Sequence, residues 1–226
     1  MDDLNDMDEI DSEYKMVLVG DTDIGKTTLF KKITKNIFNE IHVSTIGVDQ
    51  KSFEFEITTK ENEQEVKKKI KIILYDTAGQ ERYASITKNY FKRASGILLL
   101  YSIINKKSFN NLTKWVSEIR DKLGNNDDNK YLIFLIGTKY DLVKEDDSKR
   151  QITEQEALDF CEENNLLWYG EYSSKETSQQ TFQKLFTEFA KKIYETVGYN
   201  KLERDTKSVL SSQKTKKKKH HCGCKK

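Results

Sequence analysis

The chain has 226 residues, of which 39 are Lys or Arg and 37 are Asp or Glu, and its formal net charge is +2. This length is sufficient for one domain with a sizeable core and a tail. The three cysteines suggest no disulfide framework, because Cys161 stands alone in a helical pattern and the other two crowd the C-terminus. No apolar run approaches the ~20 residues of a membrane-spanning helix. We therefore expect a reducing, intracellular setting and only peripheral membrane contact.

Charge is distributed unevenly along the chain. Residues 1–13 are acidic, whereas the last dozen residues are basic. Such blocks are typical of solvated tails. We predict a disordered acidic N-terminus at 1–13, one domain at 14–198 and a disordered basic tail at 199–226.

The first predicted element is a short strand, Lys15–Val19, which stops at a glycine and is followed by a helix at Lys26–Lys35. Val48–Thr58 alternates polar and apolar residues, which predicts an antiparallel edge strand paired with the apolar strand Ile70–Tyr75. The charged segment between them, Thr59–Lys69, predicts an extended hairpin tip.

Two further apolar blocks, Ile97–Tyr101 and Tyr131–Ile136, predict central strands that are covered on both faces. A last strand is expected before Ser173. Amphipathic segments predict helices at Asn89–Arg93, Phe109–Leu123, Thr153–Asn164 and Thr181–Val197. Strands that alternate with helices predict an α/β fold of three layers, with a mostly parallel six-stranded sheet, one antiparallel edge strand and helices on both faces.

Gly20–Thr27 (GDTDIGKT) has the spacing G-x-x-x-x-G-K-[ST] and lies between a predicted strand and a predicted helix, as a phosphate-binding loop requires. Its backbone N–H groups can surround a β-phosphate, and the helix dipole adds positive potential. Lys26 supplies a positive charge, and the Thr27 hydroxyl is placed to ligate Mg²⁺. The candidate phosphate-binding residues are Asp21, Thr22, Asp23, Ile24, Gly25, Lys26, Thr27 and Thr28. The alternative, an ordinary glycine turn into a helix, does not require this spacing.

Asp76 follows the strand Ile70–Tyr75 directly, which predicts a position near the metal. Gly79 can bring its backbone N–H to a γ-phosphate, and Gln80 can orient an attacking water. These residues indicate hydrolysis of a nucleoside triphosphate.

Two further segments favour guanine over adenine. Thr138-Lys139-Tyr140-Asp141 follows the strand Tyr131–Ile136, so the Asp141 carboxylate can accept both the N1–H and the exocyclic N–H of guanine. Adenine has an acceptor at the first of these positions and would be rejected. Ser173, Ser174 and Lys175 follow another predicted strand and offer backbone N–H groups to the guanine O6.

With these motifs the chain resembles a Ras-superfamily small GTPase, and most of all the Rab family, over roughly Lys15–Val197. The segments that favour the Rab family are Ile46-Gly47-Val48-Asp49, Lys71–Glu81 with Arg82-Tyr83, Ser85-Ile86-Thr87 and Tyr90-Phe91. The resemblance implies the P-loop NTPase fold of a small GTPase G domain, with these segments forming two switch regions and their flanks. It also implies that Phe38 packs against the guanine, and that Thr45 joins Thr27 and Asp76 around Mg²⁺ when a γ-phosphate is present.

Two residues of the nucleotide site depart from the family pattern. Asp23 stands where Rab relatives usually carry glycine, and its carboxylate near an anionic ligand predicts faster nucleotide release. Thr138 stands where most relatives carry asparagine. A threonine keeps one hydroxyl but loses reach, which predicts a weaker link between the base-binding loop and the phosphate loop.

The ending Cys222-Gly223-Cys224-Lys225-Lys226 resembles the paired-cysteine C-termini to which Rab proteins attach two geranylgeranyl groups. Two such chains give durable anchoring, and the preceding lysines add attraction to an anionic leaflet. A metal-binding or inert basic tail containing His220 and His221 is the alternative.

Together these features predict a membrane-anchored switch that binds GTP or GDP with Mg²⁺ and hydrolyses GTP slowly, with Gln80 and Lys26 as catalytic residues. The resemblance implies a role in vesicle-mediated transport at the cytosolic face of intracellular membranes. It implies as partners an exchange factor, a GTPase-activating protein, effectors that read the switches, and a prenyl-shielding carrier such as a GDP-dissociation inhibitor or an escort protein. We expect a monomer that does not bind nucleic acid. The alternatives are a GTP-binding scaffold without useful hydrolysis, a P-loop ATPase or small-molecule kinase, and a lipid-tethered structural adaptor.

Overall fold

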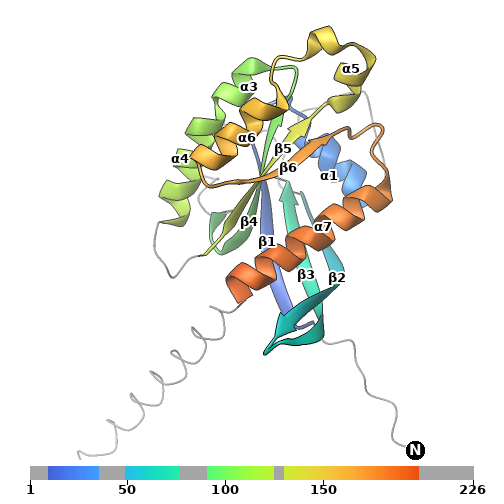
Figure 1. Cartoon of the computed structure of the whole chain (residues 1–226), viewed down its shortest axis with the longest axis vertical. Coiled ribbons are helices and arrows are strands. Elements are labelled where there is room, and N and C mark those ends of the chain that lie inside the picture. The colour runs from blue at the N-terminus through green and yellow to red at the C-terminus, as the bar shows by residue number, and fades with distance from the viewer. Residues whose placement is uncertain (1–9, 36–48, 77–90, 125–129, 199–226) are drawn as a thin grey trace, which may run out of the picture.

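The computed structural model describes residues 10–35, 49–76, 91–124 and 130–198. In this part of the chain six strands form one sheet in the order β2-β3-β1-β4-β5-β6 (Figure 1). The strands are β1 (Ser12–Val19), β2 (Asp49–Glu61), β3 (Gln64–Asp76), β4 (Ala94–Ser102), β5 (Leu132–Thr138) and β6 (Leu167–Tyr172). The β2–β3 pair is antiparallel and the other neighbouring pairs are parallel, which confirms the predicted α/β architecture.

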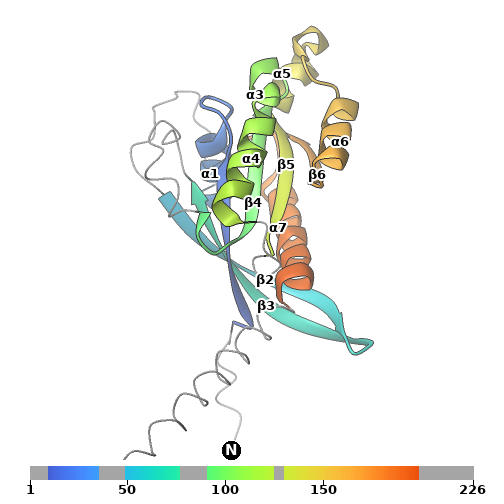
Figure 2. The same ribbon diagram turned by 90° about the vertical axis from the view of Figure 1, so that its left-hand side faces the viewer.

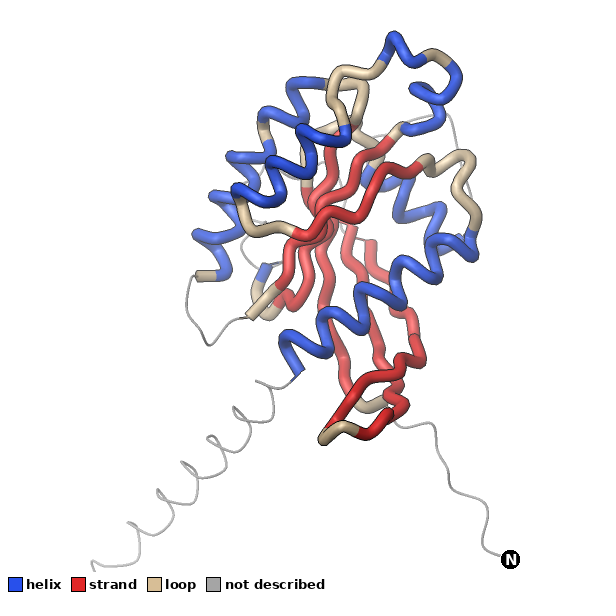
Figure 3. Tube along the Cα trace, viewed as in Figure 1, coloured by secondary structure: helices blue, strands red, loops and turns tan. Residues whose placement is uncertain are grey.

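Helices cover both faces of the sheet (Figures 1 and 3). They are α1 (Lys26–Lys35), α3 (Lys106–Asn110), α4 (Leu112–Leu123), α5 (Tyr140–Glu145), α6 (Glu154–Glu163) and α7 (Gln179–Ile193), with a 3₁₀ turn η2 (Asp147–Lys149) and a π-helical turn η3 (Tyr194–Gly198). On one face, α1 and α7 contribute to a core that includes Phe30 and Phe186. On the other, α4 and α6 contribute to a second core that includes Trp115 and Ala157.

Most of the predicted helices are confirmed, and their ends follow from capping residues. The helix at Lys26–Lys35 has the predicted bounds. In α6, Thr153 and Glu156 form a reciprocal capping box, which satisfies backbone N–H groups at the start of the helix. The helix predicted at Phe109–Leu123 is two helices, because Asn105 caps an earlier start at Lys106 and the chain turns at Asn111.

The hairpin predicted at Thr59–Lys69 is confirmed, and a continuous strand ladder forms it. Residues pair in register from Asp49↔Asp76 to Glu61↔Gln64. The two connecting residues, Asn62 and Glu63, have φ values of 49° and 66°, as in the left-handed two-residue turns that match strand twist. Figure 2 shows this hairpin projecting beyond the rest of the sheet.

The predicted boundary between an acidic tail and the domain, at residue 13, lies inside β1. Ser12 pairs with Ile70 and Glu13 with Lys71, and the Asp11 backbone N–H donates to the Lys69 carbonyl at 2.9 Å. The long strand β3 offers pairing partners this far along the chain, so the strand begins earlier than its apolar residues indicate.

The end of α7 packs against the projecting hairpin. The hydroxyl of Tyr194 donates to Glu61 Oε1 at 2.6 Å, and Lys68 Nζ lies 3.5 Å from the same oxygen. The start of β1, the β2–β3 turn and the end of α7 therefore lie at one end of the molecule (Figure 1). None of the helices in the described ranges combines the length and apolar composition needed to cross a bilayer.

Candidate functional site: the carboxyl edge of the sheet

The motif residues in the described part of the chain meet at the opposite end of the sheet. In the strand register Leu18 is beside Asp76, Ser102 beside Thr138, and Thr138 beside Tyr172. These residues lie at the carboxyl ends of their strands, where open α/β sheets bind ligands. The loops that follow β1, β5 and β6 are therefore brought to one edge.

The loop between β1 and α1 owes its shape to unusual backbone angles. Gly20, Asp23 and Gly25 have φ values of 136°, 61° and 101°, which lets the chain curl before α1. A Cβ on Gly20 would lie 2.4 Å from the Leu100 carbonyl oxygen and 2.6 Å from Ile24 Cδ1, so only glycine allows this close approach to β4. Asp23 holds a left-handed conformation that is uncommon outside glycine.

Lys26, the first residue of α1, is 5% exposed. Its ammonium donates to the carbonyl oxygens of Gly20 at 2.7 Å and Asp21 at 2.6 Å. The Lys26 ammonium therefore reaches back from α1 to the first two residues of the loop. The first turn of α1 contains no acidic residue, so its N-terminal dipole adds to this positive charge.

The carboxylate of Asp21 points to α4. Its two oxygens accept hydrogen bonds from Asn111 Nδ2 at 2.6 Å and Trp115 Nε1 at 2.8 Å. Asn111 and Trp115 were not among the predicted site residues. The one signal in the sequence is a polar residue and an indole four positions apart along an amphipathic helix, which does not reveal their common partner.

Thr138 links the base-binding segment to the phosphate loop. Its buried hydroxyl lies 2.5 Å from the Ile24 carbonyl oxygen and 2.9 Å from the Tyr101 carbonyl oxygen. The expectation that threonine lacks the reach of asparagine is thus wrong, because β5 ends close enough to the loop for the short side chain to span the gap.

Lys139 and Asp141 follow Thr138 at the start of α5, a short helix that the sequence pattern does not predict. Lys139 has a φ of 67° and Asp141 is 8% exposed. Burial lowers the pKa of Lys139, while the carboxylates of Asp23 and Asp141 act in the opposite direction. The contact between Thr138 and the Ile24 carbonyl places the two loops next to each other.

Ser173 organises the loop after β6. Its hydroxyl accepts hydrogen bonds from the backbone N–H groups of Lys175 at 3.1 Å and Glu176 at 3.0 Å. The Lys175 N–H, which was predicted to be offered to the base, thus donates within the turn in this structure. Ser174 lies in the same turn, between Ser173 and Lys175. An ion pair of 3.0 Å between Lys144 and Glu176 joins this turn to α5.

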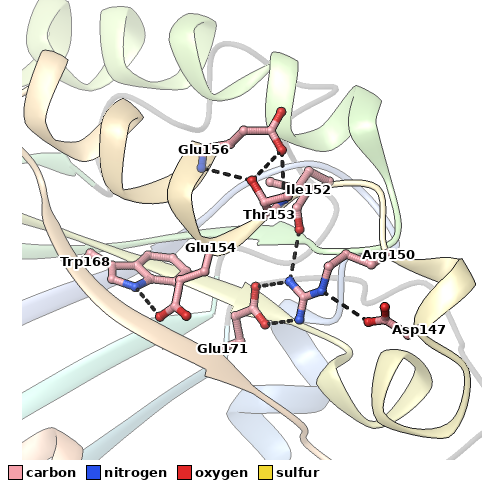
Figure 4. A network of polar contacts seen from close by, with 8 residues as sticks. All are labelled: Asp147, Arg150, Ile152, Thr153, Glu154, Glu156, Trp168 and Glu171. Carbon is pink, nitrogen blue, oxygen red and sulfur yellow. Dashed lines mark hydrogen bonds and ion pairs between the residues drawn. The ribbon is translucent and has the colours of Figure 1, made fainter.

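An ion pair links the segment that follows α5 and η2 to β6, the strand that leads into the Ser173 turn. Arg150, after η2, makes a bidentate ion pair with Glu171 of β6, with both N–O distances at 2.7 Å (Figure 4). The guanidinium also donates to the Ile152 carbonyl at 3.0 Å. A Cβ on Gly137 would lie 3.0 Å from Glu171 Cγ, so this glycine gives the pair room. Arg150 and Glu171 were also not predicted from the sequence.

Asp76 ends β3 and is fully buried. It is beside Leu18, two residues before the phosphate loop begins. Thr27 is the second residue of α1, so a carboxylate and a hydroxyl, the oxygen ligands that Mg²⁺ prefers, lie on the elements that flank the loop. The remaining predicted site residues, Phe38, Thr45, Gly79, Gln80, Cys222 and Cys224, lie outside the described residues.

A phosphate-type loop between strand and helix, on a sheet of this order, defines the chain as a P-loop nucleotide-binding protein. Comparison with known proteins narrows this class. The family model described as Ras family matches residues 15–195. The chain is 34% identical to the human Ras-related protein Rab-30 over 207 residues, covering 92% of this chain and 93% of the relative.

A second relative is the GTP-binding protein ypt3 of Schizosaccharomyces pombe, which is 37% identical over 198 residues, covering 87% of this chain and 83% of the relative. Bovine Rab-30 matches with 34% identity over 207 residues, with the same coverage as the human protein. The chain belongs to the Ras family of GTPases and is a Rab-like member of it.

Proposed function

We propose that this chain is a guanine-nucleotide switch that binds GTP and GDP with Mg²⁺ and hydrolyses GTP slowly at the carboxyl edge of its sheet. The observation that carries the proposal is the linkage of three loops: the phosphate loop, Thr138–Asp141 and the turn at Ser173. The Thr138 hydroxyl contacts the Ile24 carbonyl, and the Lys144–Glu176 ion pair joins α5, which continues the second loop, to the third. Such linkage supports one ligand held at both its phosphates and its base.

In this proposal the backbone N–H groups from Asp21 to Thr28 surround the β-phosphate, and Lys26 turns its charge from the loop carbonyls toward the ligand. Thr27 and Asp76 fit a Mg²⁺ site together with Thr45. When bound, the metal neutralises charge on the β- and γ-phosphates. Asp141 accepts the N–H groups of guanine, Ser173, Ser174 and Lys175 border its O6, and Phe38 packs on the ring.

The chain's own residues supply positioning and charge. Lys26 offsets negative charge on the phosphates, Gln80 orients the attacking water, and Gly79 donates its N–H to the γ-phosphate. Among the described residues no arginine is placed at the phosphate loop: Arg93 directly precedes the amino end of β4, Arg150 pairs with Glu171 and Arg120 Nη2 donates to the Asn164 carbonyl at 2.6 Å. We expect intrinsic turnover of about 10⁻⁴ to 10⁻² s⁻¹, increased by a partner that supplies a positive charge.

The Rab relatives favour a role in vesicle-mediated transport. We propose that residues 14–198 form the GTP-binding domain and that 199–226 carry Cys222 and Cys224 as prenylation sites at the cytosolic face of intracellular membranes. An exchange factor, a GTPase-activating protein, effectors that read the switch regions around Thr45 and Gln80, and a prenyl-shielding carrier complete the cycle.

A second candidate function is a GTP-binding scaffold with no useful hydrolysis. The observation that favours it is Asp23, an exposed carboxylate at φ 61° in the phosphate loop. Its charge opposes an anionic ligand. Hydrolysis under single-turnover conditions separates the two candidates.

Base selectivity tests the proposed ligand. We expect the purified chain to bind GDP far more tightly than ADP, and Asp141→Asn to exchange that preference for xanthosine diphosphate, because an amide can donate to the xanthine 2-carbonyl. Glu145→Gln, on the same helix, is the matched control and should leave selectivity unchanged. Equal binding of ADP and GDP by the wild-type chain would refute guanine recognition.

A further inference from the structure

Asp21 joins two separate parts of the molecule. Its carbonyl oxygen accepts from Lys26 Nζ at 2.6 Å, while its carboxylate accepts from Asn111 and Trp115. The phosphate loop is thereby connected to α4, which packs on the opposite face of the sheet from α1. A residue whose side chain only faced solvent would place no constraint on the loop.

The donors of Asp21 come from a firmly held helix. Trp115 is 9% exposed and shares a core cluster with Val19, the residue that precedes the loop. Val116 and Ile119 of the same helix are also buried. Because Asn111 and Trp115 are one turn apart, both reach the same carboxylate from one side.

Within the described residues, three contacts connect the loop to neighbouring strands and helices. Gly20 lies against the Leu100 carbonyl, Ile24 contacts Thr138, and Asp21 is held by α4. The first and second contacts position the ends of the loop. The Asp21 contact fixes the peptide that follows Gly20, where the chain leaves β1 and the first N–H groups turn toward the phosphate.

We propose that Asp21, Asn111 and Trp115 form a latch that holds the phosphate loop ready for the β-phosphate, so that Asn111 and Trp115 are positioning residues for nucleotide binding. This inference rests on the proposed function. Pre-ordering the loop lowers the cost of fixing its backbone when the ligand binds. Loss of one bond to the carboxylate should therefore weaken the contribution of the β-phosphate specifically.

The experiment compares the affinities of the full chain for GDP and GMP, which differ by the β-phosphate. We expect Trp115→Phe, which removes the indole N–H and keeps an aromatic ring, to reduce the GDP preference about tenfold. Asn111→Ala should act similarly. Trp168→Phe is the control, because that indole donates instead to Glu154 at 3.3 Å on α6 (Figure 4), and its GDP-to-GMP ratio should equal that of the wild type.

A reciprocal exchange, Asp21→Asn combined with Asn111→Asp, tests the geometry. Asn111→Asp alone places two carboxylates together and should lower the ratio, whereas Asp21→Asn alone leaves an amide oxygen that can still accept from Trp115. The double substitution restores one donor and one acceptor, and it should recover most of the preference. Unchanged ratios in Trp115→Phe and Asn111→Ala, or equal losses for GDP and GMP, would overturn the latch.

A wild-type chain that binds GDP no better than GMP would overturn the proposed function as well as the latch, so the two failures are distinguishable. If a variant does not fold, hydrogen exchange of the Trp115 indole N–H in the wild-type chain with bound GDP still tests the latch. The chain contains two tryptophans, and Trp168→Phe assigns their indole N–H resonances. Slow hydrogen exchange of the Trp115 indole is expected, and exchange as fast as in a free indole would contradict the latch.

Discussion

The two ends of the sheet are held together by different kinds of contact. At the nucleotide end, defined here as the loops after β1, β5 and β6, side chains reach backbone or carboxylate groups far away in sequence: Trp115 contacts Asp21 and Thr138 contacts Ile24. At the hairpin end, defined as residues 56–69 with Asp11 and Tyr194, a regular strand ladder carries ion pairs such as Lys67–Glu56 at 2.8 Å, and both side chains of that pair are largely exposed.

The two kinds of contact respond differently to substitution. Exposed ion pairs contribute little because water and salt screen them. A buried group that loses its partner has no such compensation. Substitutions at the nucleotide end should therefore cause the larger loss in the free energy of unfolding and also change ligand binding. Substitutions at the hairpin end should cause a small loss and leave ligand binding unchanged.

The largest effect is expected at Gly20. Gly20→Ala places a Cβ 2.4 Å from the Leu100 carbonyl oxygen, at a φ of 136°, so we expect a loss of about 3 kcal/mol or more in the free energy of unfolding. Gly124→Ala is the control. That glycine also has positive φ, but no atom of the described residues would lie within 4 Å, and about 1 kcal/mol is expected. Urea unfolding measures both, and equal losses would disprove the packing argument.

The second-largest effect is expected for Thr138→Val. The valine keeps the shape but leaves the buried Ile24 and Tyr101 carbonyls without this hydroxyl, and we expect a loss of about 1–3 kcal/mol together with faster GDP release. Thr187→Val provides the comparison, because Thr187 Oγ1 donates to the Gln183 carbonyl at 2.9 Å on the exposed side of α7. Its expected change is within about 0.5 kcal/mol. Stopped-flow fluorescence measures release of a fluorescent GDP analogue. Release from Thr138→Val that is no faster than from the wild type would contradict the predicted role of this hydroxyl.

Asp23→Gly is expected to stabilise the nucleotide end. Glycine relieves the backbone at φ 61°, which should stabilise the fold by about 1 kcal/mol, and removal of the carboxylate should slow GDP release several-fold. Asn62→Gly, at φ 49° in the hairpin turn, relieves a similar backbone without altering release. Release from Asp23→Gly that is as fast as from the wild type would show that its charge does not act on the ligand.

Tyr194→Phe should have the smallest effect. Burial and the neighbouring Glu61 carboxylate raise the pKa of Tyr194, so the phenol keeps its proton well above neutral pH. Removing its hydrogen bond to Glu61, which is partly exposed, should cost about 1 kcal/mol or less and leave GDP release unchanged. Altered release would mean that the hairpin end communicates with the nucleotide end.

Local pattern predicts much of this fold. The P-loop spacing and the start of α1 at Lys26 follow from sequence alone, because strand, glycine and helix signals are contiguous there. The early start of β1 and the regular strand pairing within the predicted hairpin were not predicted, since Ser12, Glu13 and the lysines of β3 pair through backbone groups that charge patterning does not report.

Some residues of the nucleotide site can be predicted from the sequence and others cannot. Asp76, Thr138 and Asp141 follow apolar strands, so their common edge is predictable. The Asp21 latch and the Arg150–Glu171 ion pair are not, because each joins residues whose proximity depends on the complete fold. The reach of Thr138 was misjudged for the same reason.

GTP hydrolysis by the purified chain decides most directly whether it is a hydrolysing switch. It should be measured under single-turnover conditions with Mg²⁺, for the wild type and Gln80→Leu, with nucleotide retention measured in parallel. We predict slow hydrolysis by the wild type and its loss in the variant, with nucleotide still bound by both. Tight GTP binding without wild-type hydrolysis, even with an activating partner, would contradict a hydrolysing switch and favour the scaffold.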